Sequence, residues 1–121
     1  MILVDTSVWV DHLRSGDDQL ADVLERGLVL VHPYIVGEIA CGNLRHRGEI
    51  LSLLDALPVA PRATDEEARA LIEARRLMGR GIGFVDVHLL AAAILADQGR
   101  LWTRDRKLAG VANDLGIGYA A

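Results

Sequence analysis

The chain alternates short apolar runs with stretches of helical periodicity, and this alternation restricts the fold more than any other feature. The first apolar run covers residues 2–4, and runs of the same strand-like type cover residues 28–32 and 100–103. A helical pattern follows each of them. Strands and helices that alternate in this order indicate a parallel sheet between helical layers. We therefore predict an α/β fold in which residues 1–121 form one domain.

Helical patterns account for most of the remaining chain. The first expected helix begins near Thr6 and Ser7, whose hydroxyls can cap its N-terminus. Later helices are expected at residues 16–27, 33–42, 47–57, 65–79, 85–99 and 104–116. Thr64 and Glu67 have the spacing of a capping box at the start of one of these helices. Further short strands are expected at residues 58–61 and 117–121.

The composition is that of a folded globular chain, with 51% hydrophobic and 25% charged residues. No apolar run approaches the ~18 residues of a membrane span, and the N-terminus lacks the pattern of a signal peptide. Cys41 is the single cysteine, which excludes an intrachain disulfide, and we expect it to be a small core residue. These features predict a cytoplasmic protein that does not engage a membrane.

The net charge of −4 argues against a general electrostatic grip on nucleic acid. Arginine nevertheless supplies every basic residue except Lys107, and its guanidinium is well shaped for bidentate contact with phosphate. Arginines cluster at residues 45–47, 75–80 and 104–106. Each cluster is either a solvated surface or a local site of phosphate contact.

Four acidic residues are poorly explained as surface groups: Asp5, Glu38, Asp86 and Asp105. Asp5 and Asp105 each follow an apolar strand, and the carboxyl ends of parallel strands meet at one edge of a sheet. Asp86 begins an apolar helix, and Glu38 lies in a helix with mostly apolar neighbours. Helix capping is an alternative role for Asp86 and Asp105, and an exposed helix surface is one for Glu38.

Binding of one hard cation would explain all four carboxylates together. Carboxylates that are packed together repel one another, and without a cation some of them are pushed toward protonation. Oxygen ligands without a matching set of histidines or cysteines suit Mg²⁺ or Mn²⁺ rather than zinc. Because Mg²⁺ in proteins commonly bridges to substrate phosphates, the pattern favours phosphoryl or phosphodiester chemistry.

Three segments carry a resemblance to a known family: "LVDTSVWVDHL", "YIVGEIACG" and "DVHLLAAAILADQGRLWTRDRKL". In this order they resemble the PIN-domain ribonucleases, and more narrowly the VapC-type toxins of bacterial and archaeal toxin–antitoxin pairs. The resemblance covers essentially the whole chain. It implies a three-layer α/β/α sandwich with a mainly parallel central sheet. His88 departs from the pattern, because relatives commonly have a small or apolar residue at this position.

The resemblance also assigns roles to individual residues. The catalytic and metal-binding quartet of the family carries over to Asp5, Glu38, Asp86 and Asp105. The hydroxyls of Ser7 and Thr103 carry over as supporting groups, although both could instead only satisfy backbone groups at helix starts.

The implied activity is Mg²⁺-dependent hydrolysis of RNA, with Mn²⁺ as a substitute and with 5′-phosphate and 3′-hydroxyl products. The implied partners are RNA, a cognate antitoxin protein, and a second copy of the chain in a homodimer. Arg104 and Arg106 flank Asp105 and are the first candidates for contact with RNA, followed by Arg45 and Arg80.

Two non-catalytic functions fit part of the pattern. A receiver-like switch also binds Mg²⁺ at parallel strand ends, but it needs a central phospho-accepting Asp and a late Lys in the pocket. Here Lys107 follows Asp105 within a helix, and no central strand ends on Asp. A PIN-like binding module that has lost catalysis would normally lack one of the acids, and all four are present.

Overall fold

The computed structural model describes residues 1–120 and has a parallel three-stranded sheet at its centre. Strand β1 (Ile2–Val4) lies between β2 (Val29–Leu30) and β3 (Arg100–Trp102). Both neighbours pair with β1 in parallel. The three strands therefore end at the same edge of the sheet.

The predicted strands at residues 58–61 and 117–121 are shorter than expected. Each contributes a single parallel bridge, the first to Val31 and the second to Leu101. Prolines at both ends of the first run lack the N–H groups that a longer ladder would use. Residue 121, the last of the second run, lies outside the described residues.

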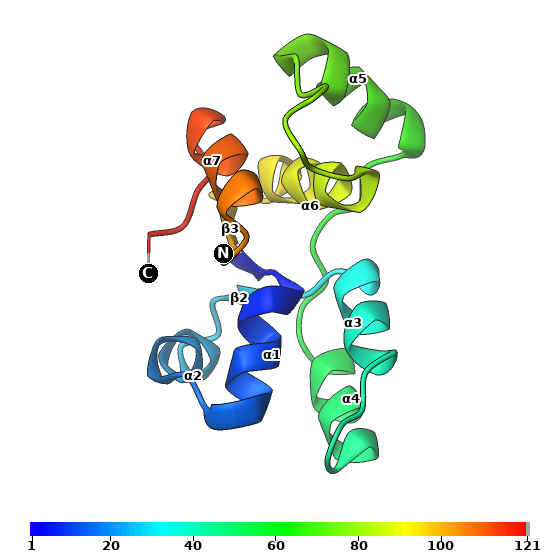
Figure 1. Cartoon of the computed structure of the whole chain (residues 1–121). Coiled ribbons are helices and arrows are strands. Elements are labelled where there is room, and N and C mark those ends of the chain that lie inside the picture. The colour runs from blue at the N-terminus through cyan, green and yellow to red at the C-terminus, as the bar shows by residue number, and fades with distance from the viewer. Residues whose placement is uncertain (121) are drawn as a thin grey trace.

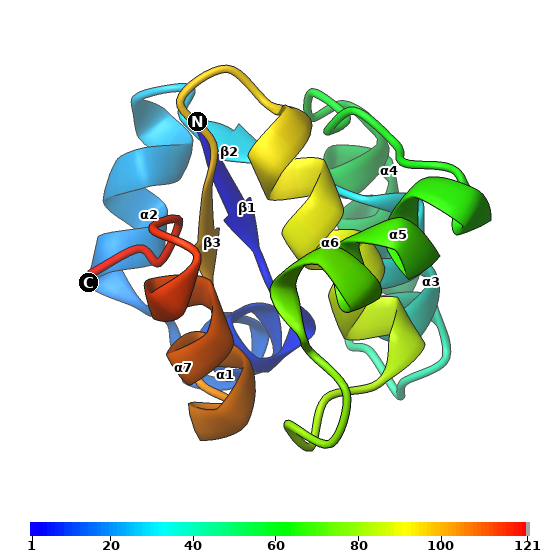
Figure 2. The same cartoon turned by 90° about the horizontal axis from the view of Figure 1, so that it is seen from above.

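Within the described residues, seven helices cover the sheet (Figure 1). Helices α1 to α4 lie on one face and α5 to α7 on the other, as Figures 1 and 2 show from two directions. This is the predicted three-layer α/β/α arrangement. The bounds are α1 Thr6–Ser15, α2 Asp18–Glu25, α3 Pro33–Ala40, α4 Arg47–Asp55, α5 Asp65–Arg75, α6 Phe84–Leu95 and α7 Arg106–Asp114.

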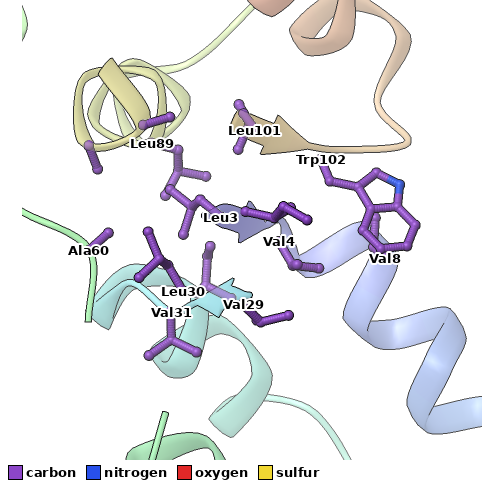
Figure 3. Close-up of a cluster of buried hydrophobic side chains, with 14 of the residues drawn as sticks. Leu3, Val4, Val8, Val29, Leu30, Val31, Ala60, Leu89, Leu101 and Trp102 are labelled. Atoms are coloured by element: carbon purple, nitrogen blue, oxygen red, sulfur yellow. The ribbon is translucent and has the colours of Figure 1, made fainter. Parts of the chain in front are cut away.

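The hydrophobic core is built around β1. Leu3 and Val4 are completely buried, and Figure 3 shows Leu89 of α6 on one side of Leu3, with Val8 of α1 and Trp102 of β3 beside Val4. Each buried Leu or Val side chain contributes about 1.5–3 kcal/mol. Residues from both helical layers therefore hold the central strand, and with it the positions of the groups that follow each strand.

The structure confirms one predicted helix cap and corrects another. The Thr64 hydroxyl accepts the Glu67 N–H at 3.0 Å, and the Glu67 carboxylate accepts the Thr64 N–H at 2.9 Å. Capping of α1 by Thr6 or Ser7 is wrong, because Asp5 occupies the N-cap position. Ser7 lies within the first turn of α1, and its hydroxyl donates to the Asp5 carboxylate at 2.8 Å.

The expectation that Cys41 is a core residue is also wrong. Helix α3 ends at Ala40, and Cys41 is its exposed C-cap. Among the described residues, none of the helices is long and apolar enough to cross a membrane.

Candidate metal centre

The parallel pairing of β1 and β3 places two of the predicted carboxylates at one end of the sheet. Asp5 follows β1, and its N–H donates to the carbonyl of Trp102, the last residue of β3, at 2.9 Å. Asp105 lies three residues further along the chain, after Trp102. Figure 2 shows β1 pointing toward the end of the molecule at which α1, α6 and α7 begin. Asp5 and Asp105 therefore border the same end of the fold, as predicted.

Helices bring the other two carboxylates to the same place. Asp86 lies in the first turn of α6, and Glu38 lies in the second turn of α3. All four carboxylates line one pocket of about 730 Å³. Asp5 is nearly buried, Asp86 is half-buried, and Glu38 and Asp105 are exposed. The structure thus brings the complete predicted quartet together from four separate elements.

Two hydroxyls hold the Asp5 carboxylate. Ser7 Oγ donates to Asp5 Oδ2 at 2.8 Å and Thr103 Oγ1 donates to the same oxygen at 2.7 Å. Each hydroxyl also accepts a backbone N–H, Ser7 from Arg104 at 3.0 Å and Thr103 from Asp105 at 3.1 Å. The two predicted alternatives for these hydroxyls, support of a carboxylate and satisfaction of backbone groups, are therefore both present.

Asp86 and Asp105 serve as helix caps and also line the pocket. Asp86 Oδ2 accepts the Gly83 N–H at 3.1 Å, and Asp105 Oδ1 accepts the N–H groups of Lys107 and Leu108 at 2.9 and 3.0 Å. Capping, considered above as an alternative to a site role, thus leaves the site role available. Among residues 1–120, one oxygen of each of the three aspartates has no hydrogen-bond donor.

The electrostatics of the pocket disfavour a full set of charged carboxylates. Although Glu38 is exposed as a whole residue, partial desolvation of its carboxylate raises its pKa, and the charges of Asp5 and Asp86 raise it further, while the Thr6 hydroxyl opposes the shift. The pKa of Asp86 is also raised, chiefly by burial, although its hydrogen bond from the Gly83 N–H opposes the shift. Positive charge placed in the pocket would relieve this repulsion.

The donor set fits a hard divalent cation. The candidate ligands are carboxylate oxygens, which Mg²⁺ and Mn²⁺ prefer. The Thr6 hydroxyl also lines the pocket and is buried beside the Glu38 carboxylate. Within residues 1–120, no three His, Cys, Asp or Glu side chains converge closely enough to hold an ion as they stand. Water molecules would therefore have to complete the coordination, as is usual for Mg²⁺.

The arginines predicted to contact RNA differ in how far they are already paired. Arg104 forms ion pairs with Asp11 and Asp17, and these carboxylates raise the pKa of its guanidinium. Arg80 pairs with Asp114, with 2.8 Å between Nη2 and Oδ2.

Arg45 and Arg106 have no ion-pair partner among residues 1–120. Arg45 lines a neighbouring hollow of about 500 Å³ together with Glu38. Arg106 is the first residue of α7. Contact with RNA stays a prediction for all four arginines.

Tyr34 was missed by the sequence analysis and lines the pocket that contains the four carboxylates. Tyr34 and Glu38 are four residues apart in α3 and so lie on one helix face; this spacing was the available signal. His32 caps α3 and fixes its start, because His32 Nδ1 accepts the Tyr34 N–H at 3.1 Å. Burial lowers the pKa of His32 to about 4, so its ring is neutral and Nδ1 is free to accept.

The repulsion in the pocket predicts a pH-dependent effect of Glu38→Gln. Without divalent cations at about pH 8, the wild-type carboxylate is charged above its raised pKa and is repelled by its neighbours. Glu38→Gln should therefore raise the free energy of unfolding at this pH. The gain should fade as the pH falls through the raised pKa, because protonated Glu38 resembles Gln.

Urea unfolding in EDTA at a series of pH values measures this difference. Glu73→Gln, which removes an exposed carboxylate on α5 outside the pocket, is the matched control. A gain for Glu38→Gln that is the same at every pH, or a loss of stability at high pH, would contradict the account of the pocket.

Comparison with known proteins agrees with this geometry. The family model for the PIN domain matches residues 2–114. Two proteins named Ribonuclease VapC32, from Mycobacterium tuberculosis strains CDC 1551 / Oshkosh and ATCC 25618 / H37Rv, are each 42% identical to this chain over 120 residues. The alignments cover 99% of this chain and 97% of each relative. The resemblance seen in the sequence is confirmed, and the chain belongs to the PIN domain family.

Proposed function

We propose that this chain is a Mg²⁺-dependent endoribonuclease that hydrolyses phosphodiester bonds in RNA. The observation that carries the proposal is the single pocket lined by Asp5, Glu38, Asp86 and Asp105. The similar proteins are named as ribonucleases, which supports RNA as the substrate. Mg²⁺, or Mn²⁺ in its place, is the cofactor that the oxygen donors favour.

Asp5, Asp86 and Asp105 would hold the cation through their oxygens that lack hydrogen-bond donors, with Glu38 completing the charge of the site. A bound divalent cation supplies positive charge beside the scissile phosphate and makes an associated water more acidic. Ser7 and Thr103 fix the orientation of Asp5 before substrate arrives, which lowers the cost of ordering the site. Glu38 lies beside the Thr6 hydroxyl and lines the pocket, where its carboxylate would orient water.

The bond changes follow from the expected products. The water oxygen joins the phosphorus, the P–O3′ bond breaks, and a proton passes to O3′, leaving a 5′-phosphate and a 3′-hydroxyl. An acidic pocket in a chain of net charge −4 repels RNA, so positive charge has to be supplied for the substrate to bind. Cations in the pocket therefore contribute to substrate binding as well as to the reaction.

Incubation of the pure protein with a mixed RNA pool tests this activity. Cleavage is expected with Mg²⁺ and not with EDTA. Asp5→Asn should slow cleavage by about 10²-fold or more, the range seen when one group that stabilises transition-state charge is removed. Asp18→Asn, which removes an exposed carboxylate at the start of α2, should leave the rate unchanged.

Cleavage that persists in EDTA, or undiminished activity of Asp5→Asn, would reject the proposed site. A wild-type protein that binds RNA and divalent cations without cleaving RNA would instead support the competing function, a non-catalytic PIN-like module. Circular dichroism of each variant shows whether its fold is retained.

We further propose that the nuclease is the toxin of a toxin–antitoxin pair, acts in the cytoplasm and forms a homodimer. The name of its relatives supports the toxin role. An active nuclease needs a tight inhibitor, and exposed apolar side chains provide surfaces for an antitoxin or a second copy. These side chains include Val10, Leu53, Ile94 and Leu95.

Expression in a bacterium tests the toxin role. Wild-type protein is expected to arrest growth, and co-expression of the cognate antitoxin should restore it. Asp5→Asn should be harmless at the same protein level, because growth arrest depends on RNA cleavage. Harmless expression of a soluble wild-type protein that cleaves RNA in vitro would count against the toxin role while leaving the nuclease proposal intact.

A further inference from the structure

An aromatic cluster adjoins the acidic pocket. The ring of His88 lies between Tyr34 of α3 and Phe84 of α6, with ring centroids 5.4 Å from Tyr34 and 4.8 Å from Phe84. Both contacts are edge-to-face, at 84° and 79° between the ring planes. His88 is 3% exposed, so it acts as a buried spacer that sets the positions of the two outer rings.

The spacer is fixed from a second helix. His88 Nε2 lies 2.9 Å from Oδ1 of Asp65, the first residue of α5. Because a carboxylate only accepts hydrogen bonds, Nε2 carries the proton and donates it. This hydrogen bond orients the His88 ring, against which Tyr34 and Phe84 both pack.

The outer rings remain accessible to solvent. Phe84 and its neighbour Val85 are each 43% exposed, although both begin the most buried helix of the fold. Tyr34 is half-buried, and Tyr34 and Val85 both line the pocket that contains the four carboxylates. Exposed apolar groups at the mouth of a charged pocket are unfavourable for the free protein and favourable for a ligand with a flat apolar part.

An arginine accompanies these rings. The guanidinium carbon of Arg62 lies 5.7 Å from the centroid of the Tyr34 ring. Arg62 is exposed and has no ion-pair partner among residues 1–120. In this respect it differs from Arg104 and Arg80, whose guanidinium groups already face carboxylates. The Arg62 guanidinium thus lies over the Tyr34 ring without a carboxylate of residues 1–120 to hold it there, and it can move from the ring to a phosphate when a base takes its place.

We propose that Tyr34 and Phe84, which are separated by His88, form a stacking site in which each ring stacks on an unpaired nucleobase of the RNA substrate, and that Arg62 contacts a backbone phosphate next to Tyr34. The proposal rests on the proposed ribonuclease function and specifies the form of RNA that is bound. Aromatic rings combined with cationic side chains are the usual means of binding single-stranded nucleic acid. Bases in a duplex are already stacked on one another, so the site selects single-stranded segments for delivery to the carboxylates.

The combination of groups favours RNA over a protein occupant. Aromatic rings and arginine also occur at protein–protein contacts, but here they adjoin a pocket suited to a phosphate-bridging cation. A nucleotide contains groups that match all three, namely a flat base, a flanking phosphate and the scissile phosphate.

Binding of short RNA to Asp5→Asn protein tests the stacking site without cleavage. The probes are a fluorescein-labelled single-stranded 12-mer containing all four bases, the same strand with abasic nucleotides, and its duplex, each measured by anisotropy in Mg²⁺. Tyr34→Leu and Phe84→Leu should each weaken binding of the intact single strand by roughly 5- to 150-fold. Tyr34→Phe and Phe84→Tyr, which keep a ring, should bind like the parent.

The abasic strand separates stacking from other effects. The Leu variants should bind the abasic strand as the parent does, because the bases are absent. Arg62→Ala should weaken binding of both strands and reduce the dependence on salt, as loss of a phosphate contact does. Arg26→Ala, which removes an exposed arginine at the C-terminal end of α2, is the matched control.

Three results would overturn the stacking site. One is unchanged binding of the intact strand to the Leu variants, which would leave the exposed rings to a protein partner. Another is that the Leu variants lose affinity for the intact and abasic strands equally, which would indicate a structural role for the rings. The third is a parent protein that prefers the duplex or binds no strand. Cleavage of the mixed RNA pool by protein that retains Asp5 is measured in parallel, so failure of the stacking site is distinguished from failure of the ribonuclease function.

Discussion

The parallel pairing of β1 with strands on both sides is the constraint on which the rest of the structure depends. Pairing in one direction makes all strands end together, so that Asp5 and Asp105 border one edge of the sheet, where the Thr103 hydroxyl hydrogen-bonds to both. The helices that follow β2 and precede β3 then bring Glu38 and Asp86 to that edge. The site is thus a consequence of topology, and the buried Leu and Val residues that hold β1 also hold the site.

The carboxylates at this edge stabilise the fold and strain it at the same time. Asp86 and Asp105 each use one oxygen to cap a helix, and Asp5 uses one to accept two hydroxyls. The remaining oxygens face a pocket in which burial, and to a lesser extent like charges, raise the pKa of Glu38 and Asp86. Fixing one oxygen while leaving the other open prepares a cation site at little cost in side-chain entropy. The repulsion that remains is the expected cost of a binding site in the absence of its ligand.

The strand order and the family resemblance predicted that the four carboxylates would share one edge of the sheet, whereas the contacts of individual side chains were only partly predictable. The Thr64 capping box and the Asp5 position at a strand end follow from local patterns. Ser7 did not follow the local capping rule, because it lies inside the first turn of α1 and its hydroxyl joins the Asp5 carboxylate to the N–H of Arg104, which is distant in the sequence. Arg104 forms ion pairs with Asp11 and Asp17, which lie 93 and 87 positions away in the sequence, and no local sequence pattern predicts such contacts.

The central claim is that Asp5, Glu38, Asp86 and Asp105 share a divalent cation. The most direct measurement is the anomalous diffraction of a crystal of this protein grown with Mn²⁺. The account predicts an anomalous peak in the pocket, in contact with oxygens of Asp5, Asp86 and Asp105 either directly or through one water. A pocket without such a peak at saturating Mn²⁺, or carboxylates that point to different places, would contradict it.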